Sequence, residues 1–118
     1  MNVDACEAFN LVNQERIVRG IAPLLISENC VDAAQYHADD MDQNNYFSHD
    51  GLDETWSERF ARFGVTGRRG ENIAQSGTPE SAVNSWMGSQ GHRENILDPR
   101  YQYTGMGYSD GLWVQCFN

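Results

Sequence analysis

The dipeptide Asp110-Gly111 near the end of the 118-residue chain constrains its fold more than any other feature. It stands between two strand-like segments, residues 104–109 and 112–117. An Asp-Gly pair between two such segments is the strongest short-range signal for a β-hairpin, because both residues tolerate the positive φ angles of a two-residue turn. The sequence therefore predicts an antiparallel hairpin that turns at this dipeptide.

The first part of the chain carries helix signals instead. Asp4 with Glu7 three residues later has the pattern of a capping box, and Gly20 followed by Pro23 marks the end of that helix. Ser27 is placed to cap a second helix. The apolar residues of this second helix recur three and four positions apart, as a buried stripe does, at Val31, Ala34, Ala38 and Met41.

Two further helices are predicted before the hairpin. Thr55 and Gly64 bracket a short segment with inward-facing aromatic residues, and residues 78–80 (Thr-Pro-Glu) form a strong helix start. Short extended segments are expected at 24–26 and 71–74. Four helices within residues 4–88, followed by a hairpin, favour an α+β layered domain.

Length and charge narrow the classes of function. The chain suits one domain, residues 1–118, and no apolar run approaches the ~20 residues that span a bilayer. The net charge of −9 repels phosphate backbones, so we expect no nucleic-acid partner. Residues 1–10 lack the apolar core of a signal peptide. We expect a monomer.

Two of the three histidines, His49 and His92, lie in loop or helix-end contexts, where functional groups concentrate. With Glu71 they supply two imidazoles and one carboxylate, a ligand set for zinc or another divalent cation. A hydrolase would need a nucleophile beside a base, and Ser89, three residues before His92, faces it if that segment is helical. His37, inside the second predicted helix, is interpreted as structural.

Five motifs occur in an order that identifies a family resemblance. They are residues 11–16 (LVNQER), 38–41 (ADDM) with 46–49 (YFSH), 70–74 (GENIA), 86–97 (WMGSQGHRENIL), and 113–117 (WVQCF). Together they span most of the chain, and the sequence resembles compact bacterial members of the CAP superfamily. This superfamily comprises cysteine-rich secretory proteins, antigen 5 and pathogenesis-related 1 proteins, also called SCP domains.

The resemblance implies a three-layer α-β-α sandwich with a small antiparallel sheet. It also implies a cleft in which His49, Glu71 and His92 converge and can hold a divalent cation, zinc first, that the fold does not require. A second acidic residue of the family cleft has no clear match, and Gln90 and Glu94 stand near its place. In the same cleft, Glu71 is either a ligand or the group that orients a histidine.

The resemblance points to a location outside the cytoplasm and to a non-enzymatic binding domain. Its partner would be a small molecule, a lipid, or a protein or other component of a cell surface. Two alternatives stay open. One is a metal- or histidine-assisted hydrolase, peptidase-like, in which Glu71, His49 and His92 are catalytic. The other is an interaction module with a vestigial cleft.

Three cysteines allow one disulfide and one free thiol. Cys30 falls at a helix position that is usually apolar in the family, where a buried thiol would pack. Cys6 and Cys116 lie near the ends of the chain, and chain ends tend to be close in compact domains. The expected disulfide is therefore Cys6–Cys116.

Overall fold

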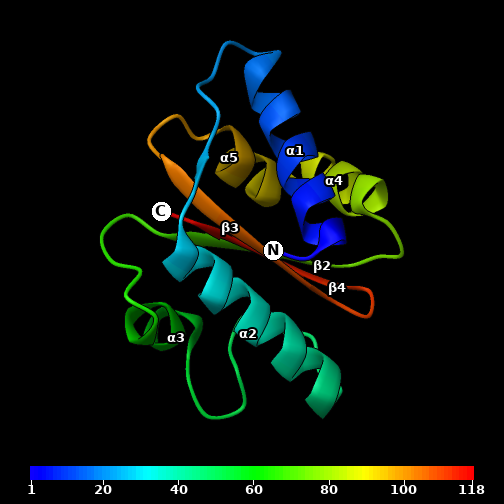
Figure 1. Cartoon of the computed structure of the whole chain (residues 1–118), viewed down its shortest axis with the longest axis vertical. Helices are drawn as coiled ribbons and strands as arrows, with labels where there is room; N and C mark the ends of the chain where they lie inside the picture. Colours follow the sequence, from blue (N-terminus) through cyan, green and yellow to red (C-terminus); the bar gives the residue numbers. More distant parts are fainter.

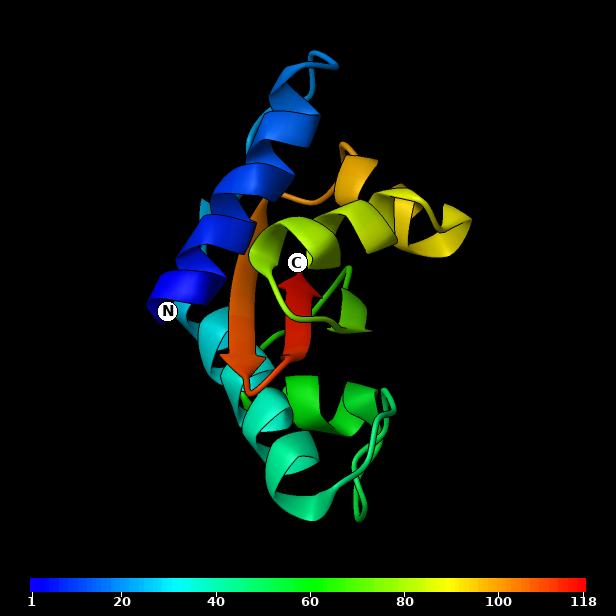
Figure 2. The same cartoon turned by 90° about the vertical axis from the view of Figure 1, so that its right-hand side faces the viewer.

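A four-stranded sheet lies between two layers of helices in the computed structural model of residues 1–118 (Figure 1). The elements are α1 (Val3–Ile17), β1 (Leu25–Ile26), α2 (Glu28–Asn44), α3 (Trp56–Arg62), β2 (Gly70–Gln75), α4 (Pro79–Met87), α5 (Gln90–Leu97), β3 (Tyr103–Ser109) and β4 (Leu112–Phe117). Helices α1, α4 and α5 cover one face of the sheet, and α2 and α3 cover the other (Figures 1 and 2). The predicted α-β-α sandwich is confirmed.

The strand order is β1-β3-β4-β2, so the last strand of the domain lies inside the sheet. The predicted hairpin is present, and Asp110 and Gly111 adopt the positive φ angles of 44° and 85° that the turn needs. β2 also pairs antiparallel with β4. The expectation of a purely antiparallel sheet needs one correction, because the two residues of β1 pair parallel with β3. The chain enters β1 after crossing from the end of α1.

Side-chain alternation along β4 divides the interior into two cores. Leu112, Val114 and Cys116 belong to the core under α2 and α3. Trp113 and Phe117 belong to the core under α1, α4 and α5. Because successive side chains of a strand point to opposite faces, one strand serves both layers.

Helix α2 packs unusually close to β3 because two glycines face it. A Cβ added to Gly105 would lie 2.1 Å from the backbone nitrogen of Val31, and one added to Gly107 would lie 2.6 Å from the carbonyl carbon of Ala34. These distances are far below contact distance, so any side chain here would push the helix away. Glycines inside a strand are typical of such a close approach by another backbone.

The predicted disulfide is wrong. The structure joins Cys30 to Cys116, with Cα atoms 5.3 Å apart, and leaves Cys6 as an exposed free thiol. The physical reason is the alternation of β4: Cys116 shares a face with Val114 and so points towards α2, which carries Cys30. Cys6 lies on α1, which covers the opposite face of the sheet. The face of β4 on which Cys116 lies therefore decides its disulfide partner, and the closeness of the chain ends does not.

Three of the four predicted helix starts are confirmed, since the side chains of Ser27, Thr55 and Thr78 cap α2, α3 and α4. The first start is corrected: Asn2, not Asp4, is the cap of α1, and its side chain accepts from the amide of Ala5. Asp4 lies in the first turn instead, where a negative charge still favours the helix dipole. The structure also adds α5, a helix beyond residue 88.

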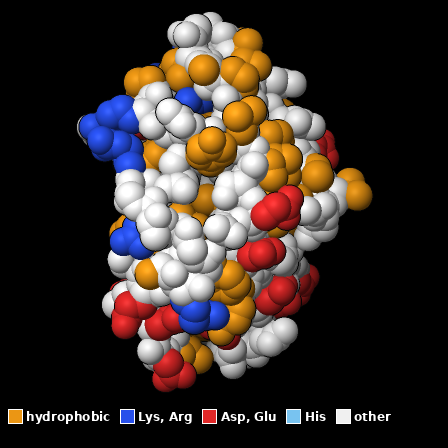
Figure 3. Space-filling model, turned by 60° about the vertical axis from the view of Figure 1, so that its left-hand side comes forward, with side chains coloured by type: hydrophobic (Ala, Val, Ile, Leu, Met, Phe, Trp, Pro, Cys, Tyr) orange, Lys and Arg blue, Asp and Glu red, His pale blue; other side chains and the backbone are white.

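One face of the molecule carries acidic and hydrophobic side chains in different places. On the face shown in Figure 3, acidic side chains gather over the lower half, which the α2 and α3 layer forms, and exposed hydrophobic side chains lie above them. Exposed hydrophobic residues of the sheet edge include Leu25, Ile26 and Tyr103. None of the helices combines the length and hydropathy that a membrane span needs.

Candidate functional site

Glu71 is the centre of a buried polar group at the start of β2. Its side chain is 2% exposed, and its Oε2 accepts from Arg59 Nη1 at 2.7 Å. Its Oε1 accepts from His49 Nδ1 at 3.0 Å. Arg59 also donates to the backbone carbonyl of His49 at 3.0 Å, so the arginine holds both the carboxylate and the loop that carries the imidazole.

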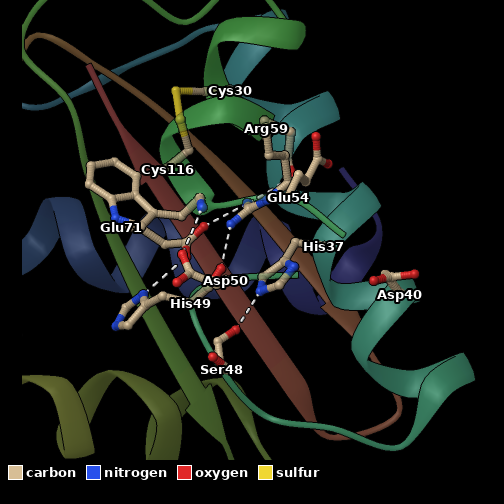
Figure 4. Close-up of polar contacts among 12 residues, drawn as sticks. Cys30, His37, Asp40, Ser48, His49, Asp50, Glu54, Arg59, Glu71 and Cys116 are labelled. Atoms are coloured by element: carbon tan, nitrogen blue, oxygen red, sulfur yellow. Dashed lines mark hydrogen bonds and ion pairs between the residues drawn. A yellow bond between two sulfur atoms is a disulfide. The ribbon is translucent and has the colours of Figure 1, made fainter. Parts of the chain in front are cut away.

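His49 is presented to solvent by this arrangement. A carboxylate can only accept, so the Nδ1 of His49 carries a proton, and in the neutral form of the ring Nε2 is left with a free lone pair. Figure 4 shows the ring turning one nitrogen to Glu71 and the other away from the ion pair. The side chain is 47% exposed. His49 is therefore a fixed imidazole whose unprotonated nitrogen is available to a ligand.

The loop before His49 is anchored to α2. The Nε2–H of His37 donates to the carbonyl of Ser48 at 2.6 Å, and Tyr46 donates to the carboxylate of Asp40 (His37–Ser48 in Figure 4). Burial and the nearby Arg59 charge lower the pKa of His37, so this ring is neutral at pH 7. The structural interpretation of His37 holds: it is a buried histidine with a satisfied hydrogen bond that fixes the loop.

His92 reaches the same region from the other layer. It lies on α5, and its backbone carbonyl accepts from Asn72 Nδ2 at 3.0 Å. Asn72 and Glu71 are neighbours on β2, so their side chains point to opposite faces of the sheet. His92 thus belongs to the layer of α1, α4 and α5, whereas Glu71 belongs to the layer of α2 and α3.

The ring of His92 pairs with a serine. Its Nδ1 lies 2.9 Å from Ser89 Oγ, which is the contact that a helical segment was expected to permit. Ser89 is the N-cap residue of α5, but its hydroxyl makes no capping hydrogen bond. Burial, with a smaller effect of the His49 charge, lowers the pKa of His92. This ring is therefore neutral at pH 7 and able to accept a proton.

Gln90 and Glu94 are on a different part of α5. They are exposed and bonded to each other, with Gln90 Nε2 3.1 Å from Glu94 Oε1. Both line a separate hollow of about 770 Å³ together with Arg93 and Arg100. Neither lines the hollow at His49 and Glu71.

The hollow at His49 and Glu71 has a volume of about 270 Å³ and lies at the β2 edge of the sheet, where the two helical layers meet. Its lining comes from α3, β2, α5 and the loops next to them: His49, Trp56, Arg69, Gly70, Glu71, Asn95 and Tyr101. It is the only one of the hollows on this surface that contains His49 or Glu71.

The donor set at this hollow suits a divalent cation only in part. Both oxygens of Glu71 are engaged, one by Arg59 and one by His49, which is the orienting role rather than the ligand role. No group of three or more His, Cys, Asp or Glu side chains is arranged to hold a metal ion. The unprotonated Nε2 of His49 remains as one free nitrogen donor at the hollow.

Sequence reasoning missed Arg59, Asn95, Trp56 and Tyr101 as site residues. A signal for Arg59 was present, because it follows Trp56 by three positions and so shares the inward face of α3. An arginine on an inward helical face needs a buried acceptor. Tyr101 and Asn95 carried no such signal, since their place in the hollow depends on how α5 and the segment before β3 meet β2.

Comparisons with known proteins agree on the family. The model of the CAP family, described as the cysteine-rich secretory protein family, matches residues 9–117. The uncharacterised protein YkwD of Bacillus subtilis is 40% identical, over 94% of this chain and 45% of its own length. An uncharacterised membrane protein of the same organism, YlbC, is 32% identical, over 94% of this chain and 33% of its own length.

Solved structures agree on the fold. An extracellular protein with an SCP domain from Bacillus anthracis superposes with a TM-score of 0.91 at 34% identity, covering 97% of this chain and 39% of its own. An outer surface protein of Borrelia burgdorferi gives a TM-score of 0.87 at 18% identity, covering 97% of this chain and 90% of its own.

Fold, motifs and family model together define an SCP-type domain. The chain belongs to the CAP family, and it spans less than half the length of the curated relatives it matches.

Proposed function

We propose that this domain is a non-enzymatic binding module that acts outside the cytoplasm and takes its ligand at the hollow beside His49. The observation that carries the proposal is the fixed imidazole. A buried ion pair between Glu71 and Arg59 holds His49 half-exposed at the rim of a hollow, with its acceptor nitrogen free. The location is supported by a disulfide and by similarity to extracellular and surface proteins.

Zinc is a second ligand in this proposal. The Nε2 of His49 binds it, His92 supplies the second imidazole, and Glu71 orients His49 instead of binding the ion. Two imidazoles and water make a weaker site than a closed four-ligand zinc site, and the fold does not depend on it.

The zinc component is tested by calorimetric titration at pH 7.5. We expect weak binding in the wild type that is lost in both His49→Ala and His92→Ala, and an unchanged thermal midpoint after chelation. Equal heats in the wild type and His92→Ala would remove His92 from the site. Glu94→Gln is the matched control, because Glu94 lies in another hollow.

The ligand component is tested by nuclear magnetic resonance. The indole N–H signals of the three tryptophans report on different places, and only Trp56 lines this hollow. We expect the Trp56 signal alone to shift when polysaccharide, peptide or lipid fractions of a Bacillus subtilis cell envelope are added. If no fraction moves it, the hollow is not a binding site.

The Ser89–His92 contact favours hydrolysis as a second candidate function. The neutral His92 lies 2.9 Å from the hydroxyl of Ser89, and a serine nucleophile beside a histidine base is the least that such a hydrolase requires. The contact lies outside the hollow, and the other nitrogen of His92 has no orienting partner in the protein, so we rank this function below binding. Labelling by a fluorophosphonate that disappears in Ser89→Ala would favour the hydrolase; absence of labelling would remove it.

A further inference from the structure

Four polar atoms on residues that line the hollow beside His49 have no hydrogen-bond partner in the protein. They are the indole N–H of Trp56, the hydroxyl of Tyr101, Oδ1 of Asn95 and Nε2 of His49. The contrast with the other tryptophans is direct, since Trp86 and Trp113 each donate their indole N–H to a backbone carbonyl at 2.9 Å. Asn95 uses only its Nδ2, which donates to Asn72 Oδ1 at 2.9 Å.

Tyr101 is held rigidly with its hydroxyl at the hollow. The residue is 7% exposed, and its ring stacks on Phe117 with centroids 5.3 Å apart. A Cβ on Gly70, which lines the hollow, would lie 2.5 Å from the Tyr101 hydroxyl and 3.3 Å from Asn95 Oδ1. The glycine thus keeps open the space that these two polar atoms border. The hydroxyl is not one of the buried polar atoms that lack a partner, which are Arg59 Nε and Gln115 Oε1, so it is open to solvent and a ligand that bonds to it replaces water.

The charged side chains at the hollow already have hydrogen-bond partners within the protein, although the guanidinium of Arg69 has no counter-charge. Glu71 is paired with Arg59, and Arg69 donates to the backbone carbonyl and hydroxyl of Ser57 and to the carbonyl of Val65. Neutral donors and acceptors therefore remain, next to the aromatic side chain of Trp56. This combination suits an uncharged ligand with several hydroxyl groups, and the net charge of −9 disfavours phosphorylated or sulfated ligands.

Two other ligand classes fit the surroundings less well. An extended peptide would add to the free edge of β2, but the carbonyls of Glu71 and Ile73 already accept from Asn95 and Trp86. An acyl chain needs a long apolar channel, whereas this hollow of about 270 Å³ is lined mostly by polar side chains.

We infer that the hollow binds one ring of a neutral oligosaccharide. The inference rests on the proposed function and specifies its ligand class. In this arrangement Trp56 donates to a sugar hydroxyl, and Asn95 Oδ1 and His49 Nε2 each accept from one. Tyr101 does either, because a phenol both donates and accepts.

The test uses the intact chain and three purified neutral probes, the tetrasaccharides of the cello-, malto- and chito- series. Heteronuclear spectra are recorded up to about 10 mM sugar, which is enough to occupy most of a site with a dissociation constant of about 1 mM. We expect at least one probe to shift the indole signal of Trp56 while the signals of Trp86 and Trp113 stay in place. A sulfated oligosaccharide, used as the charged comparison, should leave the Trp56 signal unmoved.

Variants identify the atoms involved. Tyr101→Phe removes one unpartnered hydroxyl, so we expect affinity to fall about fivefold while the thermal midpoint is unchanged. Trp56→Phe keeps an aromatic ring but loses the indole N–H, and we expect a similar loss, measured by calorimetry. Tyr103→Phe is the matched control, since Tyr103 is an exposed tyrosine outside this hollow.

The inference fails if none of the three sugars moves the Trp56 signal, or if Tyr101→Phe binds as tightly as the wild type. A shift with the peptide or lipid fraction, but with none of the sugars, would overturn the ligand class and leave the proposed binding function standing. If neither the cell-envelope fractions nor the sugars shift the Trp56 signal, both the ligand class and the proposed binding function are overturned.

Discussion

Two buried arginines, Arg16 on α1 and Arg59 on α3, show how differently the two helical layers are held. Each is 1% exposed. Arg16 donates only to backbone carbonyls, those of Ala22, Ile96, Asp98 and Tyr101, at 2.7–3.3 Å. Arg59 donates to the carboxylate of Glu71, and its Nε has no partner in the protein.

The difference separates a structural layer from a layer that carries a site. Arg16 lies at the end of α5, where carbonyl groups and the helix dipole favour a positive charge, and it ties α1 to the segment before β3. Burial lowers the pKa of Arg16, but a guanidinium stays charged. Arg59 instead neutralises the acid that orients His49. Arg16 therefore links backbone segments to one another, whereas Arg59 fixes, through Glu71, the side chain of His49 that faces the hollow.

The largest effect is expected when the ion pair is broken. Glu71→Gln leaves the Arg59 charge buried without its counter-charge, and we expect the free energy of unfolding to fall by about 4 kcal/mol. Urea denaturation measures it. Glu54→Gln is the control, because the exposed Glu54–Arg62 pair contributes less than about 1 kcal/mol. Equal losses in the two variants would mean that the buried pair is not what holds this layer.

Removing the disulfide is the next largest change, and it acts on the same layer as Arg59. Cys30 and Cys116 close a loop with a sequence separation of 86 residues. We expect the double variant Cys30→Ala/Cys116→Ala to lose about 3 kcal/mol of stability. Cys6→Ala should be neutral, since its thiol is exposed and free. A destabilised Cys6→Ala together with an unaffected double variant would restore the pairing expected from the sequence.

Arg16→Met tests the other layer. It leaves no charge unpaired, but it removes the donors of several inward carbonyls, and we expect a loss of about 2 kcal/mol. We expect this loss to be smaller than that of Glu71→Gln, because Arg16→Met leaves only neutral carbonyl groups without a partner, whereas Glu71→Gln leaves a buried charge without one. Arg19→Met provides the baseline, because Arg19 makes only an exposed pair with Glu15.

The smallest effect concerns pH. The pKa of His37 is lowered by burial in the folded protein, so the unfolded chain binds more protons below about pH 6.5. The contribution of the neutral His37 ring to the free energy of unfolding is fully present above that pH. It falls as the pH drops towards the pKa of His37 in the folded protein, by no more than about 1.4 kcal/mol per pH unit for one histidine. Urea titrations between pH 7.5 and 5.5 should give a shallower decline for His37→Gln. His92→Gln should change the slope less, because His92 is less buried.

Strand and helix signals predicted the layers well, because caps and turns are local. Ser27, Thr55 and Thr78 bond to amides three residues away, and the Asp110-Gly111 turn depends on its own φ angles. The predicted disulfide was wrong although part of the needed information is in the sequence. Counting alternate residues along the strand after the hairpin places Cys116 on the same face as Leu112 and Val114, and α2, which carries Cys30, covers that face.

The site was predictable only in part. The resemblance brought Glu71 and His49 together, as the structure does at 3.0 Å. Strand alternation separates Glu71 from the layer of His92, and the hollow at the sheet edge combines residues from three elements and three loops. Tyr101 and Asn95 enter it through packing that no local pattern encodes.

The position of β4 inside the sheet sets the order in which the domain can assemble. β4 is the last strand of the domain, and its two faces complete both cores, while its Cys116 closes the disulfide. Neither helical layer can bury its apolar surface until residues 112–117 have been synthesised and inserted between β3 and β2. Contacts so distant in sequence slow folding, so we expect the two layers to become stable together, late and cooperatively.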